Sequence, residues 1–343
     1  MRDNRMRAKM SALVFVLVLF AAVGGQVLFA AEGITPPRPA SSIVVQAEGD
    51  AFVYLPLIMR SETPPTSTPQ PPPEGDDWRS YLNWLRAIAS LPPLTENATW
   101  SAGCLNHSIY TVRNDEISHS EDPSRAWYTP EGDEAAQNSN VAVSSSTNYS
   151  AKDAMDRWMV GPFHGIAMID PRLQQVGFGL HTEADGGWQG AATLDVLRGR
   201  GSIPESVTFP VLFPGNGKEM PYTRFNGGES PNPLSSCSGY EVPTGPPLMV
   251  QLETTPQVTA YSLSKDGVAL DMCVFDETSY VGDNQDTARS ILGMRHAVVL
   301  IPREPLTAGT YTASLTTNGQ THTWSFTVAA GTALTHNGRD VSR

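Results

Sequence analysis

The 343-residue chain is poor in positive charge, with 23 Lys and Arg against 35 Asp and Glu and a formal net charge of −12. Proteins that bind nucleic acids neutralise phosphates with clustered Lys and Arg. The shortage of basic side chains therefore excludes nucleic acid as an expected partner.

Cysteine is also scarce, because the chain has only three. An odd number excludes complete pairing within one molecule and leaves one thiol unpaired or shared between molecules. Cys237 and Cys273 lie in the same later region and are the expected pair. Cys104 falls inside a helical pattern, where a buried thiol acts as a small hydrophobic side chain.

A long apolar run, SALVFVLVLFAAVGGQVLFA, stands near the beginning, after Arg2, Arg5, Arg7 and Lys9. A basic start, an apolar stretch and small residues are typical of a secretory signal. Residues 1–31 are therefore predicted to be a signal peptide cleaved near Ala30 or Ala31, and the protein to be secreted or at the cell surface. The run is nearly long enough to span a bilayer, so the alternative is an uncleaved signal that tethers the protein to the membrane.

Residues 32–75 are predicted to form a spacer, because their Pro, Thr and Ser content favours an extended chain over a packed core. Helical patterns follow at residues 78–88, 97–114 and 151–159, the last opened by a capping box of Ser150 and Asp153. Strands are expected near residues 176–181 and 191–197. Helices and strands over residues 76–200 indicate a layered α+β domain.

From about Ser202 the helical period vanishes and hairpin signals replace it. Tyr311, Ala313 and Leu315 alternate, Asn318-Gly319 fits a two-residue turn, and alternation resumes at Trp324. A second hairpin is expected around Asp266-Gly267. Residues 201–330 are thus predicted to be an all-β sandwich of the immunoglobulin-like class, followed by a tail at 331–343.

Five motifs occur in series between about residues 78 and 198. They are SLPPL at 90–94, NDEISHSE with His119, NSNVA at 138–142, WMVGPFH at 158–164 and VGFG at 176–179. In order and spacing this series resembles the CAP superfamily of cysteine-rich secretory, antigen 5 and pathogenesis-related proteins, in the form found in exported bacterial proteins.

The resemblance implies an α-β-α sandwich with a cleft in which His119 and His164 face each other. Two neutral imidazoles could hold Zn²⁺ while leaving coordination positions open. The other cleft-lining candidates are His107, Gln137, Ser139, Asn140 and Trp158; for His107 a packed structural role is the alternative.

The chain departs from the family at the position where members usually carry a Glu in the box. Depending on the alignment, Ser139 or Gln137 stands there, and neither is anionic or a useful base. Two imidazoles without an anionic partner make a weak metal site whose bound water is poorly activated. No Ser or Cys lies in a nucleophile motif, so no catalytic residue is assigned.

The first hypothesis is therefore an exported binding module whose cleft takes a small apolar or cell-envelope ligand, with or without a divalent metal. The alternative is an extracellular metal-dependent hydrolase that acts on peptide or cell-wall substrates through His119 and His164. A third reading is a structural surface protein whose cleft is vestigial.

Overall fold

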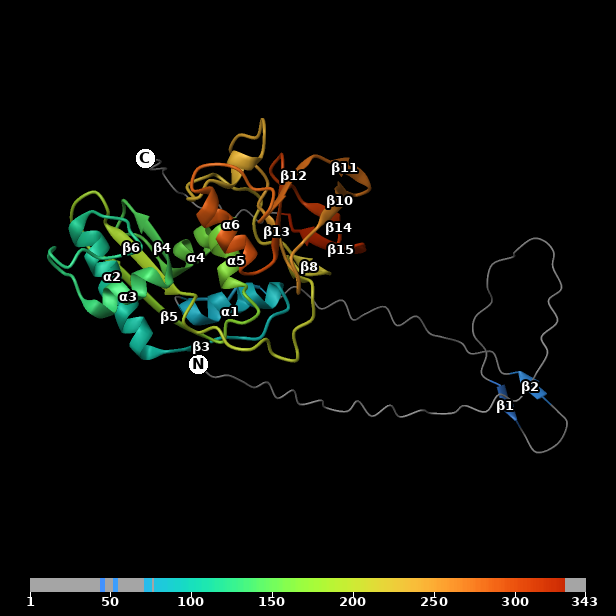
Figure 1. The fold of residues 1–343 in the computed structure, drawn as a ribbon, viewed down its shortest axis with the longest axis horizontal. Helices are drawn as coiled ribbons and strands as arrows, with labels where there is room; N and C mark the ends of the chain where they lie inside the picture. Colours follow the sequence, from blue (N-terminus) through green and yellow to red (C-terminus); the bar gives the residue numbers. More distant parts are fainter. Residues whose placement is uncertain (1–43, 47–51, 55–70, 76, 331–343) are drawn as a thin grey trace, which may run out of the picture. The chain divides into compact units, whose positions relative to one another are not determined.

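The computed structural model describes residues 44–46, 52–54, 71–75 and 77–330. The predicted signal peptide, most of the predicted spacer and the C-terminal tail lie outside the described residues. The chain divides into two compact units at Pro64 and Pro65. In the first, β1 (Val44–Gln46) pairs with β2 (Phe52–Tyr54) in antiparallel fashion. The second contains every other described element (Figure 1).

The three predicted helices are confirmed, with their caps. Helix α1 (Trp78–Ile88) begins after Asp77, whose side chain accepts from the N–H of Arg79. Helix α2 (Ala98–Asn114) is capped by Asn97. Helix α4 (Ala151–Val160) carries the full capping box of Ser150 and Asp153. Such caps satisfy N–H groups that have no partner within the helix.

A four-stranded sheet forms the centre of the α+β domain, which is called the first domain below. Its strand order is β3 (Thr95–Glu96), β5 (Gln175–Thr182), β6 (Gly190–Asp195), β4 (Ser139–Ser144). Successive side chains of β5 point to opposite faces. Gly177 and Gly179 lie against the backbone of α2, whereas the Phe178 ring stacks on Trp78 of α1 at 5.1 Å. Helices α1 and α2 therefore cover opposite faces, which confirms the α-β-α sandwich.

The segment after Gly161 differs from the sequence reading, which expected a turn and a short apolar piece. The structure has a helix here, α5 (Pro162–Met168), with Pro162 in its first turn. Proline is favoured at this position because its missing N–H would have no helical partner. A further helix, α3 (Pro130–Gln137), lies between α2 and β4 in the chain.

The C-terminal region is a β-sandwich of two sheets. One has the order β11 (Val268–Leu270), β10 (Val258–Lys265), β14 (Gly309–Thr317), β15 (Gln320–Val328), β8 (Lys218–Glu219). The other has the order β12 (Met272–Asp276), β13 (Ala297–Pro302), β9 (Leu248–Gln251), β7 (Val211–Phe213). Both predicted hairpins are confirmed, at Asn318-Gly319 and Asp266-Gly267, where all four residues have positive φ. Whether the sandwich is immunoglobulin-like stays a prediction.

One expectation for this region was wrong, since the helical period does not vanish altogether after Ser202. Helix α6 (Gln285–Gly293) connects β12 to β13, and Ala288 and Leu292 are its buried residues. Two apolar anchors in nine residues give a weak pattern, and α6 depends on packing against α5 and the neighbouring strands.

The two domains share one hydrophobic core. A single cluster of buried side chains includes Leu82 and Trp158 of the first domain and Met249 and Trp324 of the sandwich. Buried polar contacts cross the same junction: Asp170 pairs with Arg295 at 3.1 Å. The sandwich therefore packs directly on the helices of the first domain.

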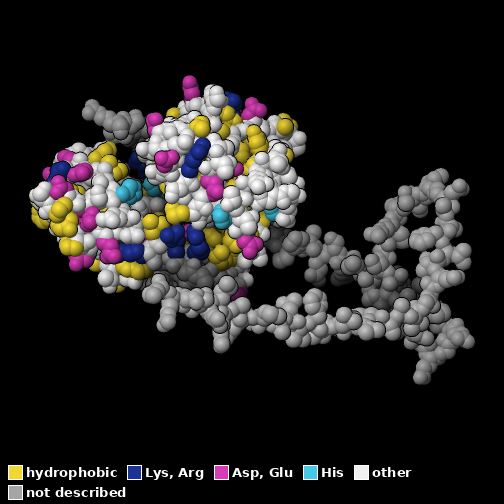
Figure 2. Space-filling model, viewed as in Figure 1, with side chains coloured by type: hydrophobic (Ala, Val, Ile, Leu, Met, Phe, Trp, Pro, Cys, Tyr) yellow, Lys and Arg dark blue, Asp and Glu magenta, His cyan; other side chains and the backbone are white. Residues whose placement is uncertain are grey.

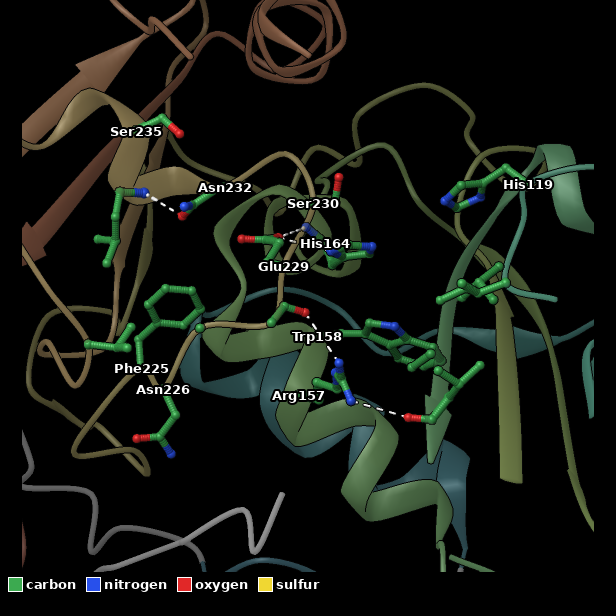
Figure 3. A pocket seen from close by; sticks show the side chains of 18 of the residues that line it. His119, Arg157, Trp158, His164, Phe225, Asn226, Glu229, Ser230, Asn232 and Ser235 are labelled. Atoms are coloured by element: carbon green, nitrogen blue, oxygen red, sulfur yellow. Dashed lines mark hydrogen bonds and ion pairs between the residues drawn. The ribbon is translucent and has the colours of Figure 1, made fainter. Parts of the chain in front are cut away.

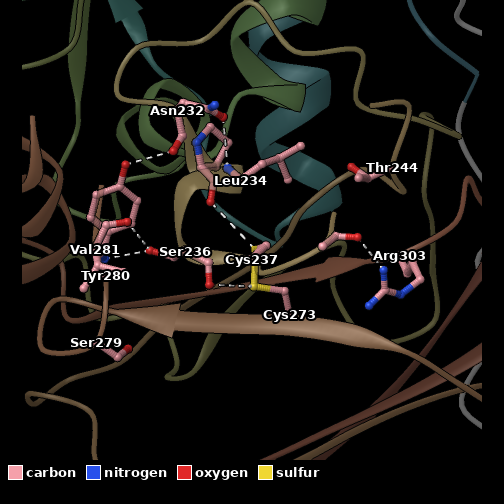
Figure 4. The surroundings of a disulfide bond; sticks show 12 residues. Asn232, Leu234, Ser236, Cys237, Thr244, Cys273, Ser279, Tyr280, Val281 and Arg303 are labelled. Carbon is pink, nitrogen blue, oxygen red and sulfur yellow. Dashed lines mark hydrogen bonds between the residues drawn. A yellow bond between two sulfur atoms is a disulfide. The ribbon is translucent and has the colours of Figure 1, made fainter. Parts of the chain in front are cut away.

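The predicted disulfide between Cys237 and Cys273 is confirmed (Figure 4). It joins β12 to the residue that follows a short 3₁₀ helix, Pro233–Ser236. Cys104 is free and fully buried, as expected, and burial raises the pKa of its thiol to about 12. No helix among the described residues is long and apolar enough to cross a membrane.

Candidate functional site

A pocket lies between the first domain and the segment that leads into the sandwich (Figure 3). Its volume is about 1050 Å³, near the upper end of the range for small-molecule sites. The space-filling view shows a hollow between the two lobes, with histidine side chains at its edge (Figure 2). The apolar part of the wall comes mainly from Val141, Ala142, Val143, Trp158, Trp188, Phe225 and Val242.

His119 and His164 both line this pocket, as predicted, although they are 45 positions apart in the sequence. In Figure 3 their rings enter from different sides, His119 from the segment before α3 and His164 from α5. The structure thus brings together the two histidines that the sequence motifs singled out.

His164 is held by a carboxylate that the sequence analysis did not single out. Glu229 lies in the segment between β8 and the 3₁₀ helix, and its Oε1 lies 2.9 Å from Nδ1 of His164 and accepts from the backbone N–H of His164 at 3.1 Å. The side chain of Glu229 is 3% exposed and that of His164 is 19% exposed. Burial raises the pKa of Glu229, and its hydrogen bonds to His164 oppose that rise.

Glu229 also completes the beginning of α5. The residue before this helix, Gly161, has no side chain to cap it. The carboxylate of Glu229 fills the space beside Gly161, where a Cβ atom would lie 2.8 Å from Glu229 Oε1. A side chain from a distant segment therefore does what a local cap does in the other helices.

His119 has no carboxylate partner, and its Nδ1 lies 3.2 Å from the carbonyl oxygen of Ala136. Although part of the residue meets solvent, loss of hydration in the pocket wall lowers the pKa of His119. The hydrogen bond to the Ala136 carbonyl opposes this lowering, and electrostatic interactions with His164 and His107 add to it. His119 is expected to be neutral at pH 7, and a neutral imidazole can accept a hydrogen bond.

His107 is placed outside the pocket, and its cleft-lining reading is corrected in favour of the packed alternative. Its side chain is fully buried, with Nδ1 3.0 Å from Glu121 Oε1 and Nε2 3.0 Å from the Ser118 carbonyl oxygen. Both ring nitrogens are therefore satisfied inside the protein. Glu121 is buried with it, contrary to the expectation of a solvated loop.

Of the remaining candidates, only Trp158 lines the pocket. Gln137 is exposed and donates to Asp133, and Ser139 is buried against Cys104. Asn140 lies behind the wall, where its amide donates to the carbonyl oxygen of His164. Neither residue at the position of the missing Glu therefore faces the pocket, and Asn140 acts on the backbone of α5.

The donor set does not fit a tightly held metal. Within the described part of the chain, no group of three or more His, Cys, Asp or Glu side chains could hold a metal ion. Zinc sites in proteins usually have at least three protein ligands. His119 and His164 offer two, and Nδ1 of His164 is already engaged by Glu229.

Glu229 was missed because nothing in its neighbourhood is typical of a site. It follows Gly227-Gly228 and precedes Ser230-Pro231, a composition that predicts only an ordered loop. The partner it meets is 65 residues away. The repeated glycines were the one available signal, because both have positive φ and turn the chain just before Glu229.

Comparison with known proteins places residues 79–190 in a family described as CAP, the cysteine-rich secretory protein family. Among solved structures, similar chains include an extracellular protein containing an SCP domain from Bacillus anthracis, with 16% identity, 35% of this chain covered and a TM-score of 0.28. This chain covers 39% of the length of that protein. Another is PcoC, a methionine-rich copper resistance protein from Escherichia coli, with 20% identity over 25% of this chain and 82% of that one, and a TM-score of 0.17. No curated protein matches the chain.

Proposed function

From the premise that this is a CAP-domain protein, with its CAP domain at residues 79–190, we propose that it is an exported binding module. Its ligand is a small apolar molecule that carries one polar group. The observation that carries the proposal is the composition of the pocket, in which an apolar wall adjoins two imidazoles and one buried carboxylate. Small-molecule sites generally combine such walls with a few polar groups that fix orientation.

The chemistry of the polar groups indicates what kind of head group is accepted. The pocket has Glu229 and Glu241 among its lining residues, and Arg157, the one Lys or Arg side chain in that lining, donates to the carbonyl oxygens of Val143 and Gly228. An anionic head would meet these charges, whereas a hydroxyl can donate to a neutral imidazole and also accept. We therefore commit to a neutral, hydroxyl-bearing apolar ligand, of which a cell-envelope lipid is one source.

The first prediction is that Nile red, a neutral apolar dye, binds the purified chain with increased fluorescence and that n-decanol displaces it. His164→Ala should weaken n-decanol about threefold to tenfold, because one neutral hydrogen bond contributes about 1 kcal/mol. Fluorescence competition measures both affinities.

The matched control for this experiment is His322→Ala. His322 lies on β15 and is absent from the pocket wall, so its replacement should leave n-decanol affinity unchanged. If n-decanol does not displace the dye, or if it binds His164→Ala as tightly as the unmodified chain, the proposed site is wrong.

The second prediction concerns a metal ion, for which the pocket offers two ligands, His119 and His164. Dialysis of the purified chain against a chelator should leave n-decanol affinity unchanged, because the ligand binds to protein side chains and not to a metal ion. Metal analysis before and after dialysis accompanies the binding measurement. Stoichiometric zinc whose removal abolishes a hydrolytic activity would instead support the alternative of a metal-dependent hydrolase acting on peptide or cell-wall polymer.

A further inference from the structure

The carboxylate that the NSNVA box lacks is present in the pocket, but it comes from outside the CAP domain. Ser139 and Gln137 are engaged away from the pocket, whereas Glu229 reaches His164 from the segment that leads into the sandwich. The match to the CAP family ends at residue 190. Glu229 thus reaches the cleft from outside the residues that match the CAP family.

The hydrogen bonds of Glu229 determine which ring nitrogen of His164 is free. An ionised carboxylate only accepts hydrogen bonds, so beside an ionised Glu229 the proton of the bond between Nδ1 and Oε1 belongs to Nδ1 of His164. The neutral ring then has its lone pair on Nε2. In Figure 3 Glu229 and His119 lie on opposite sides of the His164 ring, and the side away from Glu229 is the open part of the pocket.

We propose that Glu229 is a positioning residue for His164, which it holds in the tautomer and orientation that present Nε2 to the ligand. This inference rests on the proposed function of the pocket. Carboxylates that receive the second N–H of a binding histidine are known to fix its tautomer and ring direction.

One feature distinguishes this role from that of a simple helix cap. Oε1 of Glu229 contacts both the backbone N–H and the ring Nδ1 of His164. A helix cap needs only the backbone bond, so the second contact, to Nδ1, is what the role beside His164 adds.

The sandwich region holds the other end of the same helix. Gln251 of β9 donates to the carbonyl oxygens of Ile166 and Ile169 at 3.1 and 2.9 Å, and the side chain of Met249 packs against Gly165. Helix α5 is therefore fixed at its beginning by Glu229 and at its end by Gln251. The position of His164 is set by residues that follow the CAP domain in the sequence.

The segment that carries Glu229 is itself anchored. Its continuation is joined to β12 by the Cys237–Cys273 disulfide, and Tyr280 donates to the carbonyl oxygen of Asn232 at 2.8 Å. Arg157 of α4 donates to the carbonyl oxygen of Gly228 from the other side. These contacts hold the backbone on both sides of Glu229, as positioning of a neighbouring ring requires.

The third prediction tests this role on the full chain through the tautomer of His164, read from NMR spectra of protein with isotope-labelled histidine. In the unmodified chain Nδ1 should carry the proton. In Glu229→Ala the signal should move toward the other tautomer, and n-decanol affinity should fall by up to the threefold to tenfold expected for His164→Ala, because the ligand's hydrogen bond to Nε2 is weakened or lost. His164→Ala identifies the signal.

Two further variants keep the test decisive if Glu229→Ala unfolds. Gly161→Ala leaves Glu229 intact but puts a methyl group where its carboxylate lies, and the φ of −91° at Gly161 suits alanine; it should shift the same signal. Glu253→Gln removes an exposed carboxylate that lies outside the pocket wall, and should change neither readout.

The outcomes separate this inference from the proposed function. A proton on Nε2 in the unmodified chain, or a tautomer that is unchanged in both Glu229→Ala and Gly161→Ala, overturns the positioning role. A tautomer that shifts as expected supports that role even if n-decanol proves not to bind, a result that would count against the proposed ligand alone.

Discussion

At the scale of single residues, a buried ion pair joins the first domain to the sandwich region. Asp170 follows α5 and is fully buried, as is Arg295 after α6. Burial by itself raises the pKa of Asp170, but the hydrogen bond from Arg172 and the charges of Arg295 and Arg172 outweigh it, and the net pKa is below the usual 3.8. The folded state therefore favours the ionised form of Asp170.

The fourth prediction follows from this pair. Asp170→Asn should lower the free energy of unfolding at pH 7 by about 3–5 kcal/mol, because it leaves Arg295 buried without its counter-charge. Since the folded pKa is depressed, the stabilisation is present above pH 3.8 and is lost as pH falls through the folded pKa. The difference in the free energy of unfolding between Asp170→Asn and the unmodified chain should therefore be smaller at pH 3 than at pH 7.

Urea unfolding at pH 7 and pH 3 measures this difference. The control is Asp271→Asn, because Asp271 pairs with Arg303 at 3.6 Å on the surface, where its side chain is 82% exposed. An exposed pair contributes only about 0–1 kcal/mol. Equal effects of the two substitutions at pH 7 would contradict the assignment of Asp170 as a buried anchor.

At the scale of elements, the VGFG motif has a packing explanation. Helix α2 crosses β5 so closely that a Cβ on Gly179 would lie 2.1 Å from the backbone nitrogen of Leu105, and one on Gly177 would lie 2.5 Å from Trp100. Neither helix backbone nor strand can yield at such contacts. The two glycines are therefore what allows α2 to lie flat on the sheet.

The fifth prediction is that Gly179→Ala destabilises the protein by about 3 kcal/mol, the upper part of the range for overpacked cores. Gly187→Ala is the matched control, because a Cβ there would meet only an oxygen of Asp115 at 3.6 Å. Thermal unfolding of both variants measures the difference. A Gly179→Ala protein as stable as Gly187→Ala would show that α2 does not pack as described.

Elements with strong local signals were predictable, and those without them were not. The capping box of Ser150 and Asp153 marked the beginning of α4, and the helical pattern from residue 97 located α2, whose cap is Asn97. Helix α5 gave no such signal, since its N-cap is a glycine and its capping carboxylate is Glu229. A helix whose ends are held by distant side chains leaves little trace in its own sequence.

At the scale of the whole molecule, the CAP domain and the sandwich behave as one body. They share a continuous core, and the pocket is lined by residues before position 190 and by residues between 225 and 242. The sequence predicted the cleft within the domain at residues 76–200 and the sandwich as a separate domain. The structure makes the region beyond the CAP domain one wall of that cleft.

The sequence by itself determined the α+β class, the resemblance of one domain to the CAP family, the disulfide and the choice of the two histidines that line the pocket. It could do so because caps, alternation, turn residues and motif spacing are local patterns. Only the tertiary structure decided that His107 is buried, that the box residues face elsewhere and that Glu229 joins His164. These outcomes depend on contacts between segments tens of residues apart, which are set by how the two domains pack and leave no periodicity or motif in the chain.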